Sequence, residues 1–156
     1  MYLINESPYL FNLLNKKTFI DPSIKVLCTK GFINDYSIIE DKIIFTPRNE
    51  EFIDFLSKIN NDIIVIATDL DEAGDFIAFE ILEFLNKNNT ILRLKVNFDD
   101  LLNYEHLTKE NLLILCDDKI NFSNAERFWN NYVNKQEKIE YINVIYKDLY
   151  NSEIEL

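Results

Sequence analysis

Short apolar runs alternate along the chain with longer segments whose apolar residues recur at helical spacing. The runs predict strands at 2–4, 24–28, 43–45, 63–67, 91–96, 112–116 and 141–145. The helical spacing predicts helices that begin near residues 8, 47, 75, 100 and 124. The runs at 63–67 and 112–116 are apolar at every position, which is typical of strands buried on both faces. This alternation predicts an α/β fold, with a mostly parallel, Rossmann-like sheet and helices on both of its faces.

The composition agrees with one domain over residues 1–156, because 47% of the residues are hydrophobic and the length suits a single core. No apolar run approaches the roughly 18 residues that a membrane span requires. Residues 1–8 lack the basic and extended apolar parts of a signal peptide, so we expect a cytoplasmic protein. Cys28 and Cys116 have no metal-type spacing and are expected to be buried, reduced thiols.

The charge of the chain restricts its partners. Sixteen Lys and Arg residues stand against 27 Asp and Glu residues, which gives a net charge of −11. Proteins that grip nucleic acid neutralise several phosphates with Lys and Arg, so we expect this chain to bind nucleic acid weakly by itself. The acidity instead favours a divalent cation or a basic protein partner.

Acidic residues follow several of the predicted strands. Glu6 follows the first strand, Asp69 and Asp71 follow the strand at 63–67, and Asp117-Asp118 follow the strand at 112–116. Open α/β sheets bind ligands at the carboxyl ends of their strands, and two carboxylates with several waters suffice for Mg²⁺. The alternative is that Asp71 or Asp75 caps the following helix and that Asp117-Asp118 form an ordinary turn, which is the interpretation we prefer for the last pair.

Three segments resemble the Toprim domain of type IA DNA topoisomerases, in the same order along the chain. They are Ile4-Asn5-Glu6-Ser7-Pro8, residues 28–35 (CTKGFIND) and residues 66–79 (IATDLDEAGDFIAF). The family reads roughly V-E-S-P-A-K-A, A-S-x-G-H-I-R-D-L and A-T-D-P-D-R-E-G-E-A-I-A-W-H at these places. Residues 94–100 are faintly similar to the R-x-x-F-x-E-I-T stretch that follows. The resemblance covers residues 1–100, and residues 101–156 would be additional βα elements without an assigned role.

The resemblance implies a role for each acid. Glu6 would be the general acid or base beside a scissile phosphate, and Asp69 and Asp71 would hold Mg²⁺. The family's third acid falls on Ala73, so Asp75, at the next acidic position, is the expected third metal ligand. Crowding beside two aspartates should raise the pKa of Glu6, as an acid catalyst requires.

The departures from the family pattern leave two functions open. Five cationic or potentially cationic positions of the family are occupied by other residues here, namely Leu10, Phe32, Asn34, Glu72 and Glu80. No tyrosine stands in a context like that of the topoisomerase nucleophile, so a complete topoisomerase is not expected. One hypothesis is a Toprim protein of nucleic-acid metabolism with Mg²⁺-dependent phosphoryl transfer on DNA or RNA strands. The other is a catalytically degenerate Toprim module that binds a protein partner or regulates it.

Overall fold

The computed structural model describes residues 1–16, 20–39, 42–133 and 154–155. Its main sheet has five strands in the order β2-β1-β5-β6-β7. They are β1 (Tyr2–Asn5), β2 (Lys25–Cys28), β5 (Ile63–Ile66), β6 (Thr90–Leu94) and β7 (Cys116–Asp117). The first four in this order are mutually parallel, and β7 joins β6 as an antiparallel edge. The predicted α/β fold with a mostly parallel sheet is confirmed.

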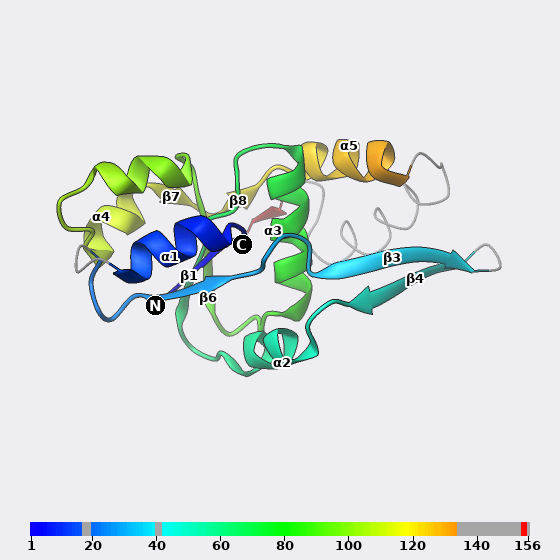
Figure 1. Cartoon of the computed structure of the whole chain (residues 1–156), viewed down its shortest axis with the longest axis horizontal. Coiled ribbons are helices and arrows are strands. Elements are labelled where there is room, and N and C mark those ends of the chain that lie inside the picture. Colours follow the sequence, from blue (N-terminus) through cyan, green and yellow to red (C-terminus); the bar gives the residue numbers. More distant parts are fainter. Residues whose placement is uncertain (17–19, 40–41, 134–153, 156) are drawn as a thin grey trace.

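Helices cover both faces of this sheet (Figure 1). One face carries α1 (Pro8–Lys16), the 3₁₀ helix η1 (Phe98–Asn103) and α4 (Lys109–Ile114); the other carries α2 (Glu50–Lys58), α3 (Glu72–Phe84) and α5 (Phe122–Val133). Alternate residues of a strand point to opposite faces, so Leu3 and Val65 belong to one core and Ile4 and Ile66 to the other. All four side chains are fully buried, each contributing roughly 1.5–3 kcal/mol. This double burial explains the uninterrupted apolar run at 63–67.

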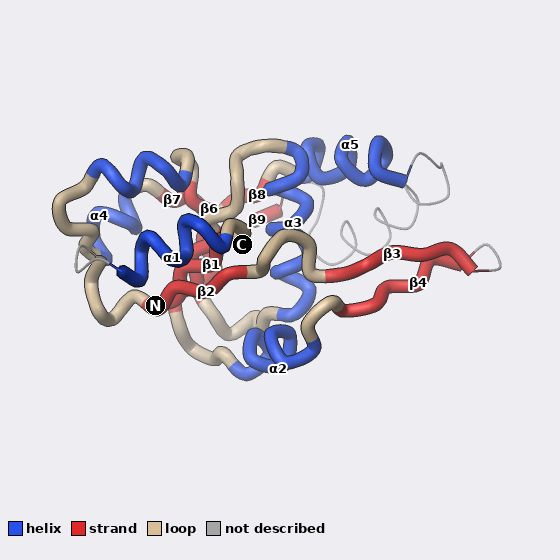
Figure 2. The backbone as a smooth tube through the Cα atoms, in the orientation of Figure 1, coloured by secondary structure: helices blue, strands red, loops and turns tan. Residues whose placement is uncertain are grey.

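A β-hairpin extends away from the sheet and its helices (Figure 2). It consists of β3 (Asn34–Ile39) and β4 (Lys42–Pro47), paired antiparallel with Asn34 opposite Pro47. The predicted strand at 43–45 lies within β4, whereas the helix predicted from Pro47 begins at Glu50, after the cap residue Asn49. The sequence pattern did not predict β3, because polar residues such as Asn34 and Asp35 interrupt its apolar positions.

One strand prediction in the second half is wrong. The run at 112–116 was predicted as a buried strand, but α4 occupies Lys109–Ile114 because Thr108 Oγ1 accepts a hydrogen bond from Asn111 N at 3.1 Å and so caps a helix. Leu112 is buried while Ile114 is exposed, as a one-sided helix requires. Asp117 therefore lies in the antiparallel edge strand β7, and its side chain forms an ion pair with Lys95 at 3.3 Å.

Other predictions of the second half have separate outcomes. The helix predicted near 100–106 is the 3₁₀ helix η1, and the helix predicted from 124 is α5. The predicted strand at 141–145 lies outside the described residues, and the two-residue strand β9 (Ile154–Glu155) pairs with β8 (Lys119–Ile120). Cys28 and Cys116 are free thiols, half-buried rather than buried, and burial raises the pKa of Cys116 to about 11. None of the described helices is long and apolar enough to cross a bilayer.

Candidate functional site

The topology creates a crevice between β1 and β5. The chain leaves β1 through α1 toward β2 on one side, and it leaves β5 through α3 toward β6 on the other. The two connections diverge above the carboxyl ends of neighbouring strands, which is the position where open α/β sheets bind ligands. Glu6 follows β1 and Asp69 follows β5, so the sheet order brings together the first two predicted acids.

A hydrogen bond joins the ends of these two strands. Glu6 Oε1 accepts from the backbone N–H of Asp69 at 2.7 Å. The turn after β1 is held by Asn5, a buried residue whose amide donates to Leu27 O at 3.1 Å and whose Oδ1 accepts from Ser7 N at 2.9 Å. The Glu6 carboxylate is therefore fixed against the segment that carries Asp69.

Residues 67–75, which we call the acidic turn, connect β5 to α3. Asp71 is the N-cap of α3, and its Oδ1 accepts from Gly74 N at 2.6 Å. Thr68 Oγ1 donates to Gly74 O at 2.7 Å and closes the turn. The structure confirms the capping role that the sequence suggested for Asp71. Metal binding by the same carboxylate stays a prediction.

Gly74 is required by a close approach between backbones. A Cβ at this position would lie 1.9 Å from the carbonyl oxygen of Asp69. The first turn of α3 therefore rests directly on the Asp69 main chain, and every side chain larger than hydrogen would push the two apart. This contact fixes Asp69 and Asp71 relative to each other.

A buried arginine lies beneath the acidic turn. Arg93, at the end of β6, is fully buried and donates to Thr68 O at 2.6 Å and to Asp69 O at 2.7 Å. It also forms an ion pair with Asp75 at 3.1 Å, and the second oxygen of Asp75 accepts from Asn124 Nδ2 at 2.9 Å. Arg93 was not singled out from the sequence, because the alternation at 91–96 reads as a half-exposed strand. The available signal was that Arg93 interrupts an apolar run, between Leu92 and Leu94.

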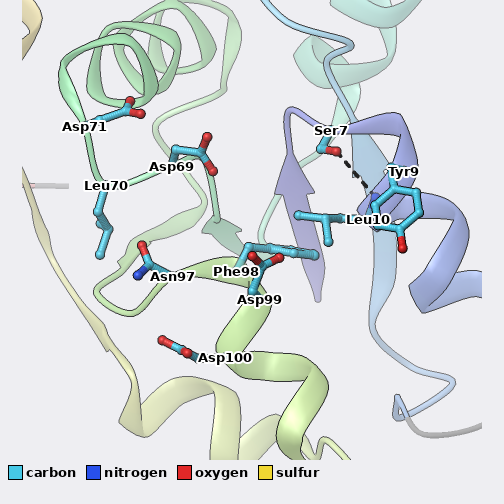
Figure 3. A pocket seen from close by; sticks show the side chains of 10 residues that line it. All are labelled: Ser7, Tyr9, Leu10, Asp69, Leu70, Asp71, Asn97, Phe98, Asp99 and Asp100. Atoms are coloured by element: carbon cyan, nitrogen blue, oxygen red, sulfur yellow. Dashed lines mark hydrogen bonds between the residues drawn. The ribbon is translucent and has the colours of Figure 1, made fainter.

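An open cleft of about 650 Å³ adjoins the acidic turn (Figure 3). Its described lining includes four aspartates and no cationic residue: Ser7, Tyr9, Leu10, Asp69, Leu70, Asp71, Asn97, Phe98, Asp99 and Asp100. No role was assigned to Asn97, Asp99 or Asp100 from the sequence. They follow the predicted strand at 91–96, as Glu6 and Asp69 follow theirs, and this shared position was the signal for a place in the site. Glu6, which contacts the acidic turn through the N–H of Asp69, is not among the described lining residues, and neither are Asp75, Asp117 and Asp118.

The electrostatics of the site favour proton binding by two of its acids. Burial is the main cause that raises the pKa of Glu6, and the charges of Asp69 and Asp71 add to it, against the hydrogen bond from Asp69 N and the charge of Arg93. Burial, Asp71 and Asp99 likewise raise the pKa of Asp69, against Arg93. The predicted direction for Glu6 is confirmed, with burial as a larger cause than crowding.

The donor set agrees with a hydrated divalent cation. Among the described residues, no three His, Cys, Asp or Glu side chains gather as a complete protein ligand set. Mg²⁺ typically binds through one or two carboxylates and keeps several waters, so Asp69 and Asp71 on one short turn meet its requirement. Asp75 is less suited, because it is 4% exposed and both of its oxygens accept hydrogen bonds from side chains.

Comparison with known proteins identifies the fold. No protein-family description matches the chain, and no curated protein is similar to it in sequence. Among solved structures, full-length topoisomerase I from Thermotoga maritima is similar, with a TM-score of 0.51 and 16% sequence identity. The match covers 85% of this chain and 24% of that chain, so this chain spans about a quarter of the topoisomerase's length. At this identity the similarity shows the fold alone, which is an α/β fold similar to that of part of the topoisomerase.

Proposed function

We propose that residues 1–156 form a Toprim-like domain of nucleic-acid metabolism that binds Mg²⁺ through Asp69 and Asp71. Glu6 is its general acid or base for phosphoryl transfer on DNA or RNA strands. The observation that carries the proposal is the hydrogen bond from Asp69 N to Glu6 Oε1, at 2.7 Å, above two neighbouring parallel strands. It joins Glu6 to Asp69, two of the three acids that the Toprim resemblance singles out, and Asp71 follows on the same turn, on a fold similar to that of part of topoisomerase I.

Each acid has a distinct task in this proposal. A bound Mg²⁺ would neutralise charge on a phosphate during transfer. The N-cap bond, which uses Asp71 Oδ1, and the Gly74 contact hold the backbone between Asp69 and Asp71, so the two acids would offer their carboxylates from one fixed turn. Glu6 is partly buried and burial raises its pKa, which is the direction that a proton donor to a leaving oxygen requires.

The cleft limits how nucleic acid reaches this site. Its described lining holds four aspartates and no Lys, Arg or His, in a chain of net charge −11. Phosphates would therefore be repelled unless a cation screens them, and we propose that a protein partner supplies the missing phosphate contacts. The same observation favours the second candidate function, a catalytically degenerate Toprim module that binds or regulates a protein.

Metal-dependent stabilisation tests the proposal. Mn²⁺ or Mg²⁺ at about 100 times its dissociation constant should stabilise the wild type by about 2.7 kcal/mol. For a chain of this size that corresponds to a rise in Tm of about 5–10 °C. Asp69→Asn/Asp71→Asn should lose this shift. Glu50→Gln/Glu51→Gln, which neutralises two exposed acids in the first turn of α2, should retain it.

Strand cleavage separates the two candidate functions. Labelled single strands are incubated with the protein and Mn²⁺ at low salt, and cleavage that Glu6→Gln abolishes would support the enzyme. A metal-induced rise in Tm without binding or cleavage of the strands would support the degenerate module. A wild type that no metal stabilises would contradict metal binding in either function.

A further inference from the structure

The acidic turn rests on a buried guanidinium. Arg93 is fully buried, and its two terminal nitrogens donate to Thr68 O, Asp69 O and, at 3.3 Å, Ile66 O. Three carbonyl groups at the end of β5 and the start of the turn therefore point toward one planar group. A guanidinium holds several acceptors in fixed directions, which an ammonium group on a flexible stem does not do.

Asp75 reaches the same guanidinium from the first turn of α3. Its Oδ1 accepts from Arg93 Nη2 at 3.1 Å, and its Oδ2 accepts from Asn124 Nδ2 at 2.9 Å. A buried charge without its partner is costly, so the positions of Arg93 and Asp75 depend on each other. The two residues link the end of β6 to the helix that begins at the acidic turn.

Helix α5 also contacts Asp75, through Asn124. This helix lies in residues 101–156, which the Toprim resemblance does not cover. Asn124 lies in its first turn, and Arg127 donates both to Asn124 Oδ1 and to Glu72 Oε1, the latter at 3.0 Å. Trp129, at 2% exposure, stacks on Phe76 of α3 with ring centroids 5.5 Å apart. This packing fixes the position of α5 and thereby the donor that Asn124 presents to Asp75.

We propose that Arg93 is a positioning residue for Asp69, and that Asp75 and Asn124 support the acidic turn instead of binding a metal. Arg93 holds the Thr68 carbonyl, so the Thr68–Asp69 peptide group directs the N–H of Asp69 to Glu6 on its opposite side. The bond from Arg93 to the Asp69 carbonyl fixes the next peptide group, and the Asp69 side chain lines the cleft (Figure 3). The consequence for metal binding rests on the proposed function. The support itself is a property of the metal-free protein.

Amide hydrogen exchange in the metal-free, full-length chain tests the support. Arg93→Lys keeps the charge but loses the planar geometry, and Asn124→Ala removes one donor to Asp75. In both variants we expect the amide of Asp69 to exchange about tenfold faster, while the amides of β5 keep their protection. Lys95→Met is the matched control: it removes the next cation along from Arg93, one that contacts Asp117 and Lys119 and not the turn.

The outcomes distinguish this inference from the proposed function. Folded variants whose Asp69 amide exchanges as slowly as in the wild type would overturn the support. Faster exchange throughout β5 would overturn it too, because the effect would then be a general loss of stability. If the support holds, Arg93→Lys and Asn124→Ala also lose the Mn²⁺-induced rise in Tm, while Lys95→Met keeps it. A wild type without that rise would contradict the proposed function. The exchange result would still show whether Arg93 and Asn124 hold the acidic turn in place.

Discussion

Replacement of Gly74 by alanine tests the close approach that shapes the acidic turn. The added methyl carbon would lie 1.9 Å from the carbonyl oxygen of Asp69, and 2.6 and 2.8 Å from its carbonyl carbon and amide nitrogen. Ordinary contact begins near 3.4 Å. The start of α3 would therefore have to move about 1.5 Å from the Asp69 backbone. A backbone cannot rotate aside as a flexible side chain would.

Two opposing effects determine how much Gly74→Ala changes the free energy of unfolding. Overpacking of this kind typically costs about 1–3 kcal/mol, and a clash with backbone belongs at the upper end or above it. Alanine in a helix is favoured over glycine by about 1 kcal/mol, which offsets part of the loss. We expect Gly74→Ala to lower the free energy of unfolding by about 2 kcal/mol, or the Tm by about 4–8 °C for this chain length.

Urea and thermal denaturation measure this effect, with Ala73→Gly as a control in the same helical turn. The control should lose about 1 kcal/mol through helix propensity and keep its response to Mn²⁺. Gly74→Ala should lose both stability and that response, because Asp69 is displaced. A Gly74→Ala protein as stable as the wild type, or more stable, would refute the reasoning, since propensity alone predicts that result.

Other predictions concern single contacts. Asp75→Asn leaves Arg93 buried without its counter-ion and should cost about 3–5 kcal/mol in urea denaturation; a loss below about 1 kcal/mol would contradict the buried pair. Thr108→Ala removes the cap of α4 and should cost about 0.5–2 kcal/mol without changing the response to Mn²⁺, whereas unchanged stability would speak against the cap. The folded-state pKa of Glu6 is raised above 4.5, so its contribution to stability is complete below that pH and is lost as the pH rises. Glu6→Gln should therefore gain stability relative to the wild type from acid to neutral pH, and a constant difference would contradict the shift.

The sequence predicted the parts of the fold that local pattern and strand burial determine. The run at 63–67 is apolar on both faces because two helical layers cover β5, and this pattern leaves little choice of structure. The run at 112–116 is equally apolar but forms a helix, because the cap at Thr108 outweighs a pattern shared by buried strands and helices. Hairpin strand β3 shows how polar residues conceal a strand that lies outside the main sheet.

The candidate site was predictable where residues follow strands, and not where it depends on strand order. Glu6 and Asp69 were placed at strand ends from the sequence. Their contact requires β1 and β5 to be neighbours, and this depends on the pairing of strands that lie far apart along the chain, such as Leu3 with Val65. Arg93 and Asn124 donate hydrogen bonds to Thr68 O and to Asp75, and no local sequence pattern predicts these tertiary contacts. The acids were therefore found from the sequence, and their support required the structure.

Paramagnetic broadening by Mn²⁺ tests most directly whether the acids form one cation site. In amide NMR spectra of the wild type, substoichiometric Mn²⁺ should first broaden the signals of Glu6, Asp69 and Asp71, and Asp69→Asn/Asp71→Asn should abolish this broadening. Asp54, an exposed aspartate of α2, which precedes the amino end of β5, provides an internal comparison and should keep a sharp signal. Broadening that begins at Asp54, or spreads evenly over exposed carboxylates, would contradict a metal site at the acidic turn.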